Sequence, residues 1–450
     1  MYGNEIVALR GPNHKVFAHA DDPSKQIMQI HAKPIHYKNI ASGIMEDIDL
    51  SFQDNGKDMI SSKNMVSVGF RKDGNPQKYM GIRAHNDHGQ QFELSIYSAT
   101  INSIILPLAG FRKVSLDTIE QCIINHELSD NVGFHTQVHE AFVQTAIKTE
   151  YPVSDFSISF EVHLTGWNCI NEYDDGSNSY IENEYGRFVF VSSDGTKLWF
   201  ERPSMWTDNE HMARGIDHRL EVSGKKFIYS KTANDMGRKW LQTANAPFFI
   251  DASIHYADTR DGMSYIANAL SWTTIRDQAT PSAAFNDIVN NGNSAEAKYA
   301  APFYALYRSW FWFDTSAVTG TVDSVSLFLY GYGLADSDVC AMKSIQDDVL
   351  ANWTMTAFTG SEYGHVTWAL SQYNEIVFNS TGISDINTSG DTKVCIREYT
   401  HDYLNSSPTT RYANGCYYSD NTGTDYDPYL EIVISTGVTE DALYMGFVIV

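Results

Sequence analysis

The chain of 450 residues is 43% hydrophobic and 19% charged, which excludes wholesale disorder and leaves room for two or three domains. Its formal net charge of -23 repels phosphate backbones, and no basic stripe offsets that charge, so nucleic acid is excluded as a partner. No stretch approaches the roughly 18 apolar residues that a membrane span needs, and no membrane partner is expected.

Residues 1–134 are predicted to form a β-rich domain. Its short runs of β-branched and aromatic residues, such as 65–70 and 91–97, are separated by turn-forming Asp, Asn and Gly. One short helix is expected near residues 115–125, because Ser115 can cap it and apolar residues recur behind it at helical spacing. The N-terminus shows no basic region that leads into an apolar run. We therefore expect no secretory signal and a protein made in a cytoplasm.

Residues 135–254 are predicted to form a central β-sandwich. The stretch 155–164 alternates between apolar and polar residues, as a strand with one buried face does. The region closes with 239–251, in which Pro247 forces an extended path.

The most regular pattern in the chain lies at 307–316 and 322–330, two alternating stretches joined by a short turn. Aromatic and β-branched residues at period two indicate strands whose two faces meet different surroundings. We predict that this pair forms the core of a C-terminal domain over residues 255–437. The second stretch has Val325, Leu327 and Leu329 on one face, and Ser324, Ser326, Phe328 and Tyr330 on the other.

Seven segments carry a resemblance to a known family: 239–251, 272–276, 308–314, 322–329, 428–431, 29–37 and 47–49. The first is similar to the segment that closes a β-rich module in that family, and the last two resemble the opening of such a module. Together these segments resemble a family of large surface and phage-associated proteins. In that family a β-rich module precedes a DNRLRE-like jelly roll of the carbohydrate-binding type. The resemblance covers about half of the chain and implies a fold, not a reaction. It implies an all-β chain of several antiparallel β-sandwiches, with one or two short helices and a C-terminal jelly roll over 255–437.

A short apolar strand ends the chain, within residues 438–450. An apolar strand at a chain end must pair with a sheet edge, either in its own domain or in a neighbouring subunit. We therefore predict an assembly strand, whose residues include Tyr444, Phe447, Val448 and Ile449.

The alternation at 307–316 places Arg308, Trp310 and Trp312 on one face of their strand. Such a set could form a sugar-stacking platform. The alternative is that these large side chains pack between sheets or under the loop at 255–300. We predict a glycan site at these three residues and keep packing inside the protein as the alternative.

Two acidic or histidine-containing motifs are candidate metal sites. His135 and His139, next to Glu140, have the i, i+4 spacing of a zinc site on a helix, although no third ligand is evident. The segment 420–427 is rich in oxygen ligands of the type that calcium prefers, but it lacks EF-hand spacing. The residues that would hold calcium are Asp420, Asp425 and Asp427.

The five cysteines are scattered without a CxxC pair, which argues against a disulfide scaffold. Buried free thiols are expected. One bridge among Cys340, Cys395 and Cys416 stays open as an alternative.

No nucleophile elbow, phosphate loop or dinucleotide fingerprint is present, so we expect no enzyme and no cofactor besides a structural calcium. The resemblance and the missing secretory signal indicate a structural component of a bacteriophage virion: a capsid decoration, head-fibre or tail-associated protein. Its partners would be other virion proteins and further copies of itself. The main alternative is a glycan-binding adhesion module for host polysaccharide, and a third is a polysaccharide-degrading enzyme.

Overall fold

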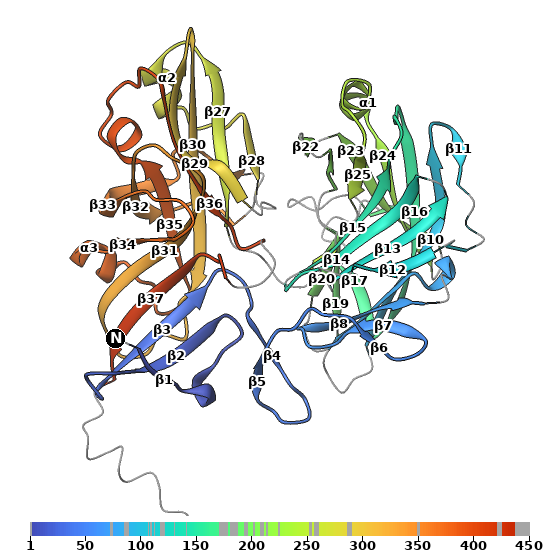
Figure 1. Cartoon of the computed structure of the whole chain (residues 1–450), viewed down its shortest axis with the longest axis horizontal. Coiled ribbons are helices and arrows are strands. Elements are labelled where there is room, and N and C mark those ends of the chain that lie inside the picture. Colours follow the sequence, from blue (N-terminus) through green and yellow to red (C-terminus); the bar gives the residue numbers. More distant parts are fainter. Residues whose placement is uncertain are drawn as a thin grey trace, which may run out of the picture. The chain divides into compact units, whose positions relative to one another are not determined.

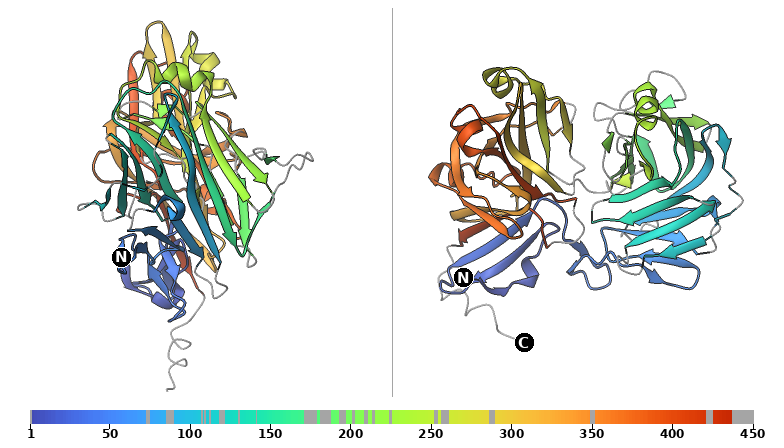
Figure 2. Two further views of the ribbon diagram at one scale, coloured as in Figure 1. Left: turned by 90° about the vertical axis from the view of Figure 1, so that its right-hand side faces the viewer. Right: turned by 45° about the horizontal axis from the view of Figure 1, so that its top comes forward.

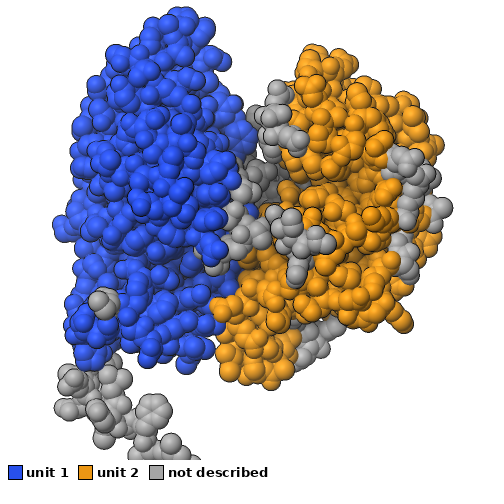
Figure 3. Space-filling model, in the orientation of Figure 1, with its two compact units in different colours: residues 1–36, 259–450 blue, residues 37–258 orange. Residues whose placement is uncertain are grey.

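The computed structural model describes the chain except for residues 1, 73–74, 85–89, 107, 109, 112, 118–121, 130, 141, 171–178, 181–187, 193–196, 201–202, 208–210, 213–214, 224–225, 252–253, 256–260, 286–289, 349–351, 421–424 and 437–450. The chain divides into two compact units (Figure 3). Unit 1 comprises residues 1–36 and 259–450, and unit 2 comprises residues 37–258. Strands make up most of both units, which confirms the predicted all-β class (Figure 1). Figure 2 shows the same preponderance of strands from two further sides.

Unit 1 is built on one sheet that bends into two layers. Strand β31 pairs with β37 and β34 along its first part and with β36 along its last part, where the register shifts. It therefore belongs to both layers. The strands of this sheet are β1 (Tyr2–Glu5), β2 (His14–His19), β3 (Lys25–His31), β27 (Asp261–Ala269), β28 (Ala283–Phe285), β29 (Asn290–Ala300), β30 (Phe303–Asp314), β31 (Thr321–Ala335), β32 (Asp338–Ser344), β33 (Phe358–Thr367), β34 (Tyr373–Val377), β35 (Asp391–Glu398), β36 (Arg411–Tyr417) and β37 (Tyr429–Ser435).

The core of unit 1 lies between these layers. Phe311 and Phe313 of β30 pack in the same buried cluster as Leu327 and Leu329 of β31. All four are fully buried, as the alternation of the two stretches predicts. Full burial of each such side chain contributes about 1.5–3 kcal/mol.

The N-terminal segment belongs to unit 1, which differs from the predicted domain of residues 1–134. Strand β3 pairs with β37 from Lys25 opposite Ser435 to His31 opposite Tyr429. The two strands are about 400 residues apart in sequence, so the local pattern could not indicate this pairing.

Unit 2 is a sandwich of two antiparallel sheets around a second core. The ten-stranded sheet contains β6 (Gln53–Asp54), β7 (Asp58–Ser61), β8 (Val66–Arg71), β9 (Met80–Ala84), β10 (Gln91–Ile101), β11 (Ile104–Ile105), β16 (Phe156–Thr165), β18 (Ser179–Tyr180), β23 (Ile216–Ser223) and β24 (Lys226–Ala233). The eleven-stranded sheet contains β12 (Lys113–Leu116), β13 (Ile123–Ser129), β14 (Val132–Val138), β15 (Phe142–Thr149), β17 (Trp167–Ile170), β19 (Phe188–Ser192), β20 (Lys197–Phe200), β21 (Met205–Trp206), β22 (His211–Met212), β25 (Phe248–Asp251) and β26 (Ile254–His255). A separate two-stranded sheet joins β4 (His36–Lys38) to β5 (Met45–Asp47).

The predicted boundary between residues 134 and 135 is wrong, because it falls inside strand β14. Strand β10 also pairs with β16 along its whole length, across that boundary. The first predicted domain, apart from its N-terminal segment, and the second are therefore one sandwich.

The helix predicted near residues 115–125 is also wrong in the part that the structure describes. Ser115 and Leu116 lie in β12, and Ile123 and Ile124 lie in β13. The two strands pair, with Ser115 opposite Asn125 and Leu116 opposite Ile124. Ile124 is fully buried in the core of the sandwich, and this burial outweighs the local helical spacing.

The helices in the described residues are short: α1 (Asp235–Leu241), α2 (Trp272–Asp277), α3 (Ser380–Ser384), a π-helical turn (Tyr399–Tyr403) and 3-10 turns at Val7–Leu9 and Pro76–Lys78. Within the described residues no helix has the length and apolar character needed to cross a membrane.

Candidate ligand-binding surfaces

Arg308, Trp310 and Trp312 are exposed by only 0%, 0% and 4%, so the predicted sugar platform is wrong. Their strand is an inner strand of its layer, and the chain around Trp353 covers their face. The Trp310 indole N–H donates to the Ser264 hydroxyl at 2.9 Å, and the Trp312 ring stacks on Trp353 at 5.4 Å. A stacking platform needs an open ring face, and these rings are covered.

Arg308 takes part in a buried ion network. Its guanidinium donates to both carboxylate oxygens of Asp402, at 2.8 and 2.5 Å, and Arg397 donates to the same two oxygens at 2.9 and 2.6 Å. Burial would raise the pKa of Asp402, but the two guanidinium groups outweigh it and hold that pKa well below its usual range. The network is thus a structural part of unit 1 that links β30, β35 and the π-helical turn in its interior.

The histidine pair predicted as a helical zinc site lies on a strand and just beyond it. His135 is half-buried in β14 and contacts the Asn125 side chain at 3.0 Å, while His139 and Glu140 are buried after the strand ends. The i, i+4 spacing brings two side chains together only on a helix, and neither residue lies on one. Among the described residues, no group of three possible metal ligands is found at either histidine. The prediction of a helical zinc site is therefore wrong.

The predicted calcium ligands are not gathered either. Asp420 and Asp427 are buried, whereas Asp425 is exposed. The Lys33 ammonium lies 3.1 Å from the Asp427 carboxylate, so this anion already has a cationic neighbour. No group of three His, Cys, Asp or Glu side chains in the described part of the chain could hold a metal ion. The described residues of 420–427 thus do not fit calcium.

Four cysteines in the described residues are free and buried: Cys122, Cys340, Cys395 and Cys416. The bridge left open among the last three is therefore not formed. Burial raises the pKa of the Cys395 and Cys416 thiols to about 12, so both stay protonated and unreactive.

The predicted assembly strand, with Tyr444, Phe447, Val448 and Ile449, lies outside the described residues.

Strands β31, β34, β36 and β37 of unit 1 are labelled in Figure 1. Aromatic side chains from these strands and from the turn before β37 contact one another on one side of the sheet. Because successive residues of a strand point to opposite faces, burial of Leu327 and Leu329 turns their neighbours outward. We call this surface the tyrosine face. Its members are Phe328, Tyr330, Tyr332, Tyr373, Tyr417, Tyr426 and Tyr429.

The rings of the tyrosine face form one connected group. Tyr330 lies at its centre, 4.5 Å from the ring of Tyr426, 5.2 Å from Tyr373 and 5.9 Å from Tyr417. Tyr426 in turn stacks on Tyr417 at 4.7 Å. Tyr332 marks the outer edge with 37% exposure, and the other rings are partly exposed. Each residue of the tyrosine face is therefore at least partly open to solvent.

Polar groups around these rings are hydroxyls and carboxylates. The Tyr373 hydroxyl donates to the backbone carbonyls of Asp425 and Asp427, at 3.0 and 3.1 Å. Burial raises the pKa of Tyr429 to about 12, and it also raises the pKa of Tyr417. The phenols are therefore neutral at physiological pH. They can donate and accept hydrogen bonds beside a ring face.

Sequence patterning located only part of the tyrosine face. Phe328 and Tyr330 were assigned correctly to the face opposite Leu327. Tyr373, Tyr417 and the others come from strands that meet β31 only in the folded sheet, so spacing could not connect them. The one signal for them was the count of 26 tyrosines.

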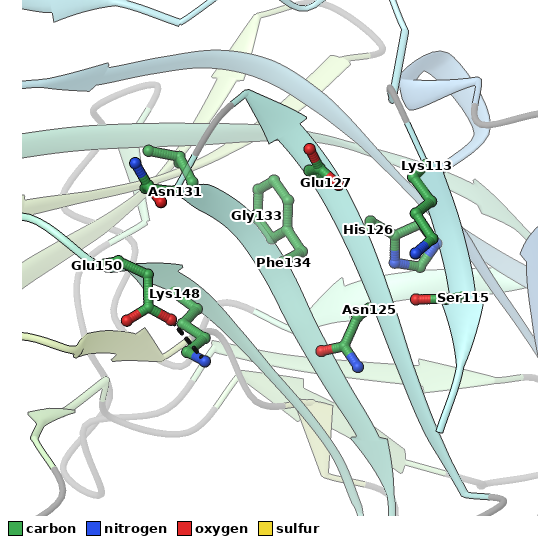
Figure 4. A pocket seen from close by; sticks show the side chains of 11 residues that line it. Lys113, Ser115, Asn125, His126, Glu127, Asn131, Gly133, Phe134, Lys148 and Glu150 are labelled. Atoms are coloured by element: carbon green, nitrogen blue, oxygen red, sulfur yellow. Dashed lines mark ion pairs between the residues drawn. The ribbon is translucent and has the colours of Figure 1, made fainter. Parts of the chain in front are cut away.

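A pocket of about 180 Å³ lies on the eleven-stranded sheet of unit 2 (Figure 4). Lys113, Glu127, Gly133 and Lys148 occupy one row across β12–β15. The Lys148 ammonium is already paired with Glu150 at 2.7 Å, as the dashed line in Figure 4 shows. We consider this pocket the weaker candidate, because the Lys148 charge at one end of its row is already neutralised by Glu150.

No protein-family model matches the sequence, and a search of curated proteins finds no match. The DNRLRE-like resemblance therefore stays a prediction.

Several solved structures are similar to parts of the chain at low scores. Heparan sulfate lyase HepC from Pedobacter heparinus has 10% identity and a TM-score of 0.27; the match covers 50% of this chain and 40% of the lyase. A carbohydrate-binding module of the β-sandwich superfamily has 8% identity, a TM-score of 0.14 and coverages of 60% and 97%. The N-terminal domain of the Streptococcus gordonii adhesin Sgo0707 has 8% identity, a TM-score of 0.16 and coverages of 96% and 93%. Scores this low carry no argument about function, so the site itself must carry it.

Proposed function

We propose that the chain is a glycan-binding β-sandwich protein and that it binds through the tyrosine face of unit 1. One observation carries this proposal: seven aromatic side chains gather on the outer side of a sheet, where water-facing residues are ordinarily polar. A contiguous aromatic patch on a surface marks an interaction site. Sugar rings suit it, because their C–H faces pack on aromatic rings and their hydroxyls bond to the phenols.

The ligand we propose is a neutral polysaccharide. The exposed carboxylates of Glu375 and Asp425 border the tyrosine face, and the chain carries a net charge of -23. An acidic polymer would be repelled here. Binding without cleavage is part of the proposal.

The test is affinity electrophoresis of the full chain in gels that contain a β-glucan, a galactomannan or dextran. We expect at least one of these to retard the wild-type protein. Tyr332→Ala and Tyr417→Ala should each weaken binding by about two- to tenfold, since a lost ring contact is worth about 0.5–1.5 kcal/mol. Tyr332→Phe should retain most of the binding, because it keeps the ring.

The matched control is Tyr97→Ala, which removes a tyrosine that is 58% exposed in unit 2. Circular dichroism would confirm that each variant is folded. Retardation by none of the three polymers, or equal retardation of Tyr417→Ala and Tyr97→Ala, would refute the proposal. Release of reducing ends from a bound polymer would refute the non-catalytic part alone.

A second candidate function is the structural role in a bacteriophage virion, in capsid decoration, a head fibre or the tail. Its support is that tyrosine is enriched in the cores of protein–protein interfaces, so the tyrosine face also suits contact between subunits. In that case the full chain should sediment as an oligomer that Tyr417→Ala dissociates. It should also appear at many copies per particle in a stained gel of purified virions. A monomer that still binds polysaccharide would exclude this role for the tyrosine face.

A further inference from the structure

A second hollow of about 220 Å³ lies in unit 2, on the outer face of the ten-stranded sheet. Its floor is Gly69 of β8 and Gly81 of β9, which are cross-strand partners. Ile60 of β7 and Glu93 of β10 extend the same row at its two ends. We call this hollow the glycine groove. It runs across four strands, a span of about 14 Å.

The two glycines have no conformational reason to be there. Neither has a positive φ. A Cβ atom on Gly69 would lie 3.7 Å from its nearest neighbour, the Ile60 side chain, and one on Gly81 would lie 3.9 Å from the Glu93 side chain. Both are ordinary contact distances, so alanine fits at either position. Glycine in the middle of a strand weakens it and often marks close approach of a ligand to the backbone. The absence of side chains at Gly69 and Gly81 leaves open space above the sheet at this point.

The walls of the groove carry cations. Arg71 is paired with Asp58 at 3.5 Å. Lys78 and Arg83 are exposed, and neither forms an ion pair with any residue that the structure describes. Three cations and two carboxylates, Asp58 and Glu93, thus line the groove, which leaves it locally positive in a chain whose net charge is -23.

The rest of the lining includes the side chains of Ser67 and Gln91 and two carboxylates, Asp58 and Glu93. The Gln91 amide donates one hydrogen bond to the Glu93 carboxylate. Ser67, Arg83 and Gln91 form the cross-strand row next to the glycine row, so a guanidinium, a hydroxyl and an amide stand side by side. Guanidinium groups bind carboxylates through paired hydrogen bonds, and hydroxyl and amide groups suit sugar hydroxyls.

We propose that the glycine groove binds a carboxylate-bearing sugar unit of an acidic polysaccharide. The flat floor lets a sugar ring lie against the backbone, while Arg83 and Lys78 bind the carboxylate. This site differs from the tyrosine face in unit, in charge and in ligand, and it does not depend on the function proposed there.

The experiment measures binding of the full chain to polygalacturonate by isothermal titration calorimetry at low salt. We expect binding that weakens as salt is added. Arg83→Gln should reduce the affinity at least tenfold. The double variant Gly69→Ala, Gly81→Ala should do the same by filling the floor, and it should unfold at the same or a higher temperature than the wild type. Arg219→Gln, on β23 of the same sheet, is the matched control and should bind as the wild type does.

Three further arms decide what is recognised. Tyr417→Ala should bind polygalacturonate normally, which separates this site from the tyrosine face. Polyglutamate and inorganic phosphate at equal charge concentration should compete weakly. Equal binding by wild type and Arg83→Gln, or polyglutamate binding as tight as that of polygalacturonate, would overturn the proposal. If the double alanine variant does not fold, the comparison of Arg83→Gln with Arg219→Gln still decides the outcome.

Discussion

His126 should make the stability of unit 2 depend on pH. Its side chain is 1% exposed and lies among the rings of Phe70, Tyr79 and Phe111, at 5.4, 5.2 and 4.8 Å. Neither ring nitrogen has a hydrogen-bond partner among the described residues. Burial lowers the pKa of His126 from 6.5 to about 3, so the folded protein holds it neutral.

The direction of the effect follows from proton binding. Below pH 6.5 the unfolded chain takes up a proton on His126, and the folded chain does not until the pH nears 3. The contribution of His126 to the free energy of unfolding is therefore fully present above pH 6.5 and is lost progressively as the pH falls toward 3. At pH 5.0 the loss from this one group is about 2 kcal/mol relative to pH 7.5, since one pKa unit is worth about 1.4 kcal/mol.

His126→Phe tests this reasoning, because a phenyl ring suits the aromatic surroundings and cannot be protonated. Urea unfolding of the full chain at pH 7.5 and at pH 5.0 should show that the variant gains about 2 kcal/mol on the wild type at the lower pH. His19→Gln, at a partly exposed position in unit 1, is the control and should leave the wild-type pH dependence unchanged. If the difference between His126→Phe and wild type is the same at both pH values, His126 is not buried as a neutral ring and the argument fails.

Three further predictions concern buried groups. Asp402→Ala should lower the free energy of unfolding by about 3–5 kcal/mol, because it leaves two buried guanidinium groups without their carboxylate. The control Asp235→Ala, on the surface, should cost less than about 1 kcal/mol. Urea midpoints would measure both, and equal effects would contradict the ion network. Cys395 and Cys416 should not react with Ellman's reagent at pH 8 in the native protein and should react fully in urea, because both thiols are buried. Rapid labelling of either thiol in the native protein, located by mass spectrometry, would refute this prediction. Lys33→Ala should destabilise unit 1 by up to about 3–5 kcal/mol, because it removes the ammonium 3.1 Å from the buried Asp427 carboxylate and leaves only the His31 ring, 3.7 Å away, beside it. A thermal unfolding curve like that of the wild type would contradict this expectation.

The face assignments of β30 and β31 show how far local pattern reaches. Alternation placed Leu327 and Leu329 on one side and Phe328 and Tyr330 on the other, and the structure agrees. The same rule places Trp310 on one face with Arg308 and Trp312 but does not say what covers that face. Trp353, which covers that face, lies about 40 residues further along the chain, so the side chains expected to form a sugar platform are buried in the interior.

The segment 115–125 shows the opposite failure. Apolar residues at helical spacing and a capping serine are weak preferences, worth a few tenths to about 1 kcal/mol. Burial of Ile124 in the sandwich core is worth more, and pairing with neighbouring strands satisfies the backbone. The segment therefore contributes to two paired strands, β12 and β13, and not to the predicted helix.

Period-two alternation and turn residues were sufficient for the all-β class and for the two faces of the clearest strands, because both properties arise from neighbours along the chain. Partner strands, domain limits and the two proposed binding surfaces arose from contacts between distant segments: β3 with β37, Tyr330 with Tyr417, and Gly69 with Gly81. A strand's exposed edge can pair with many sequences, and the choice among them is made by the burial of the whole core, which no local pattern contains.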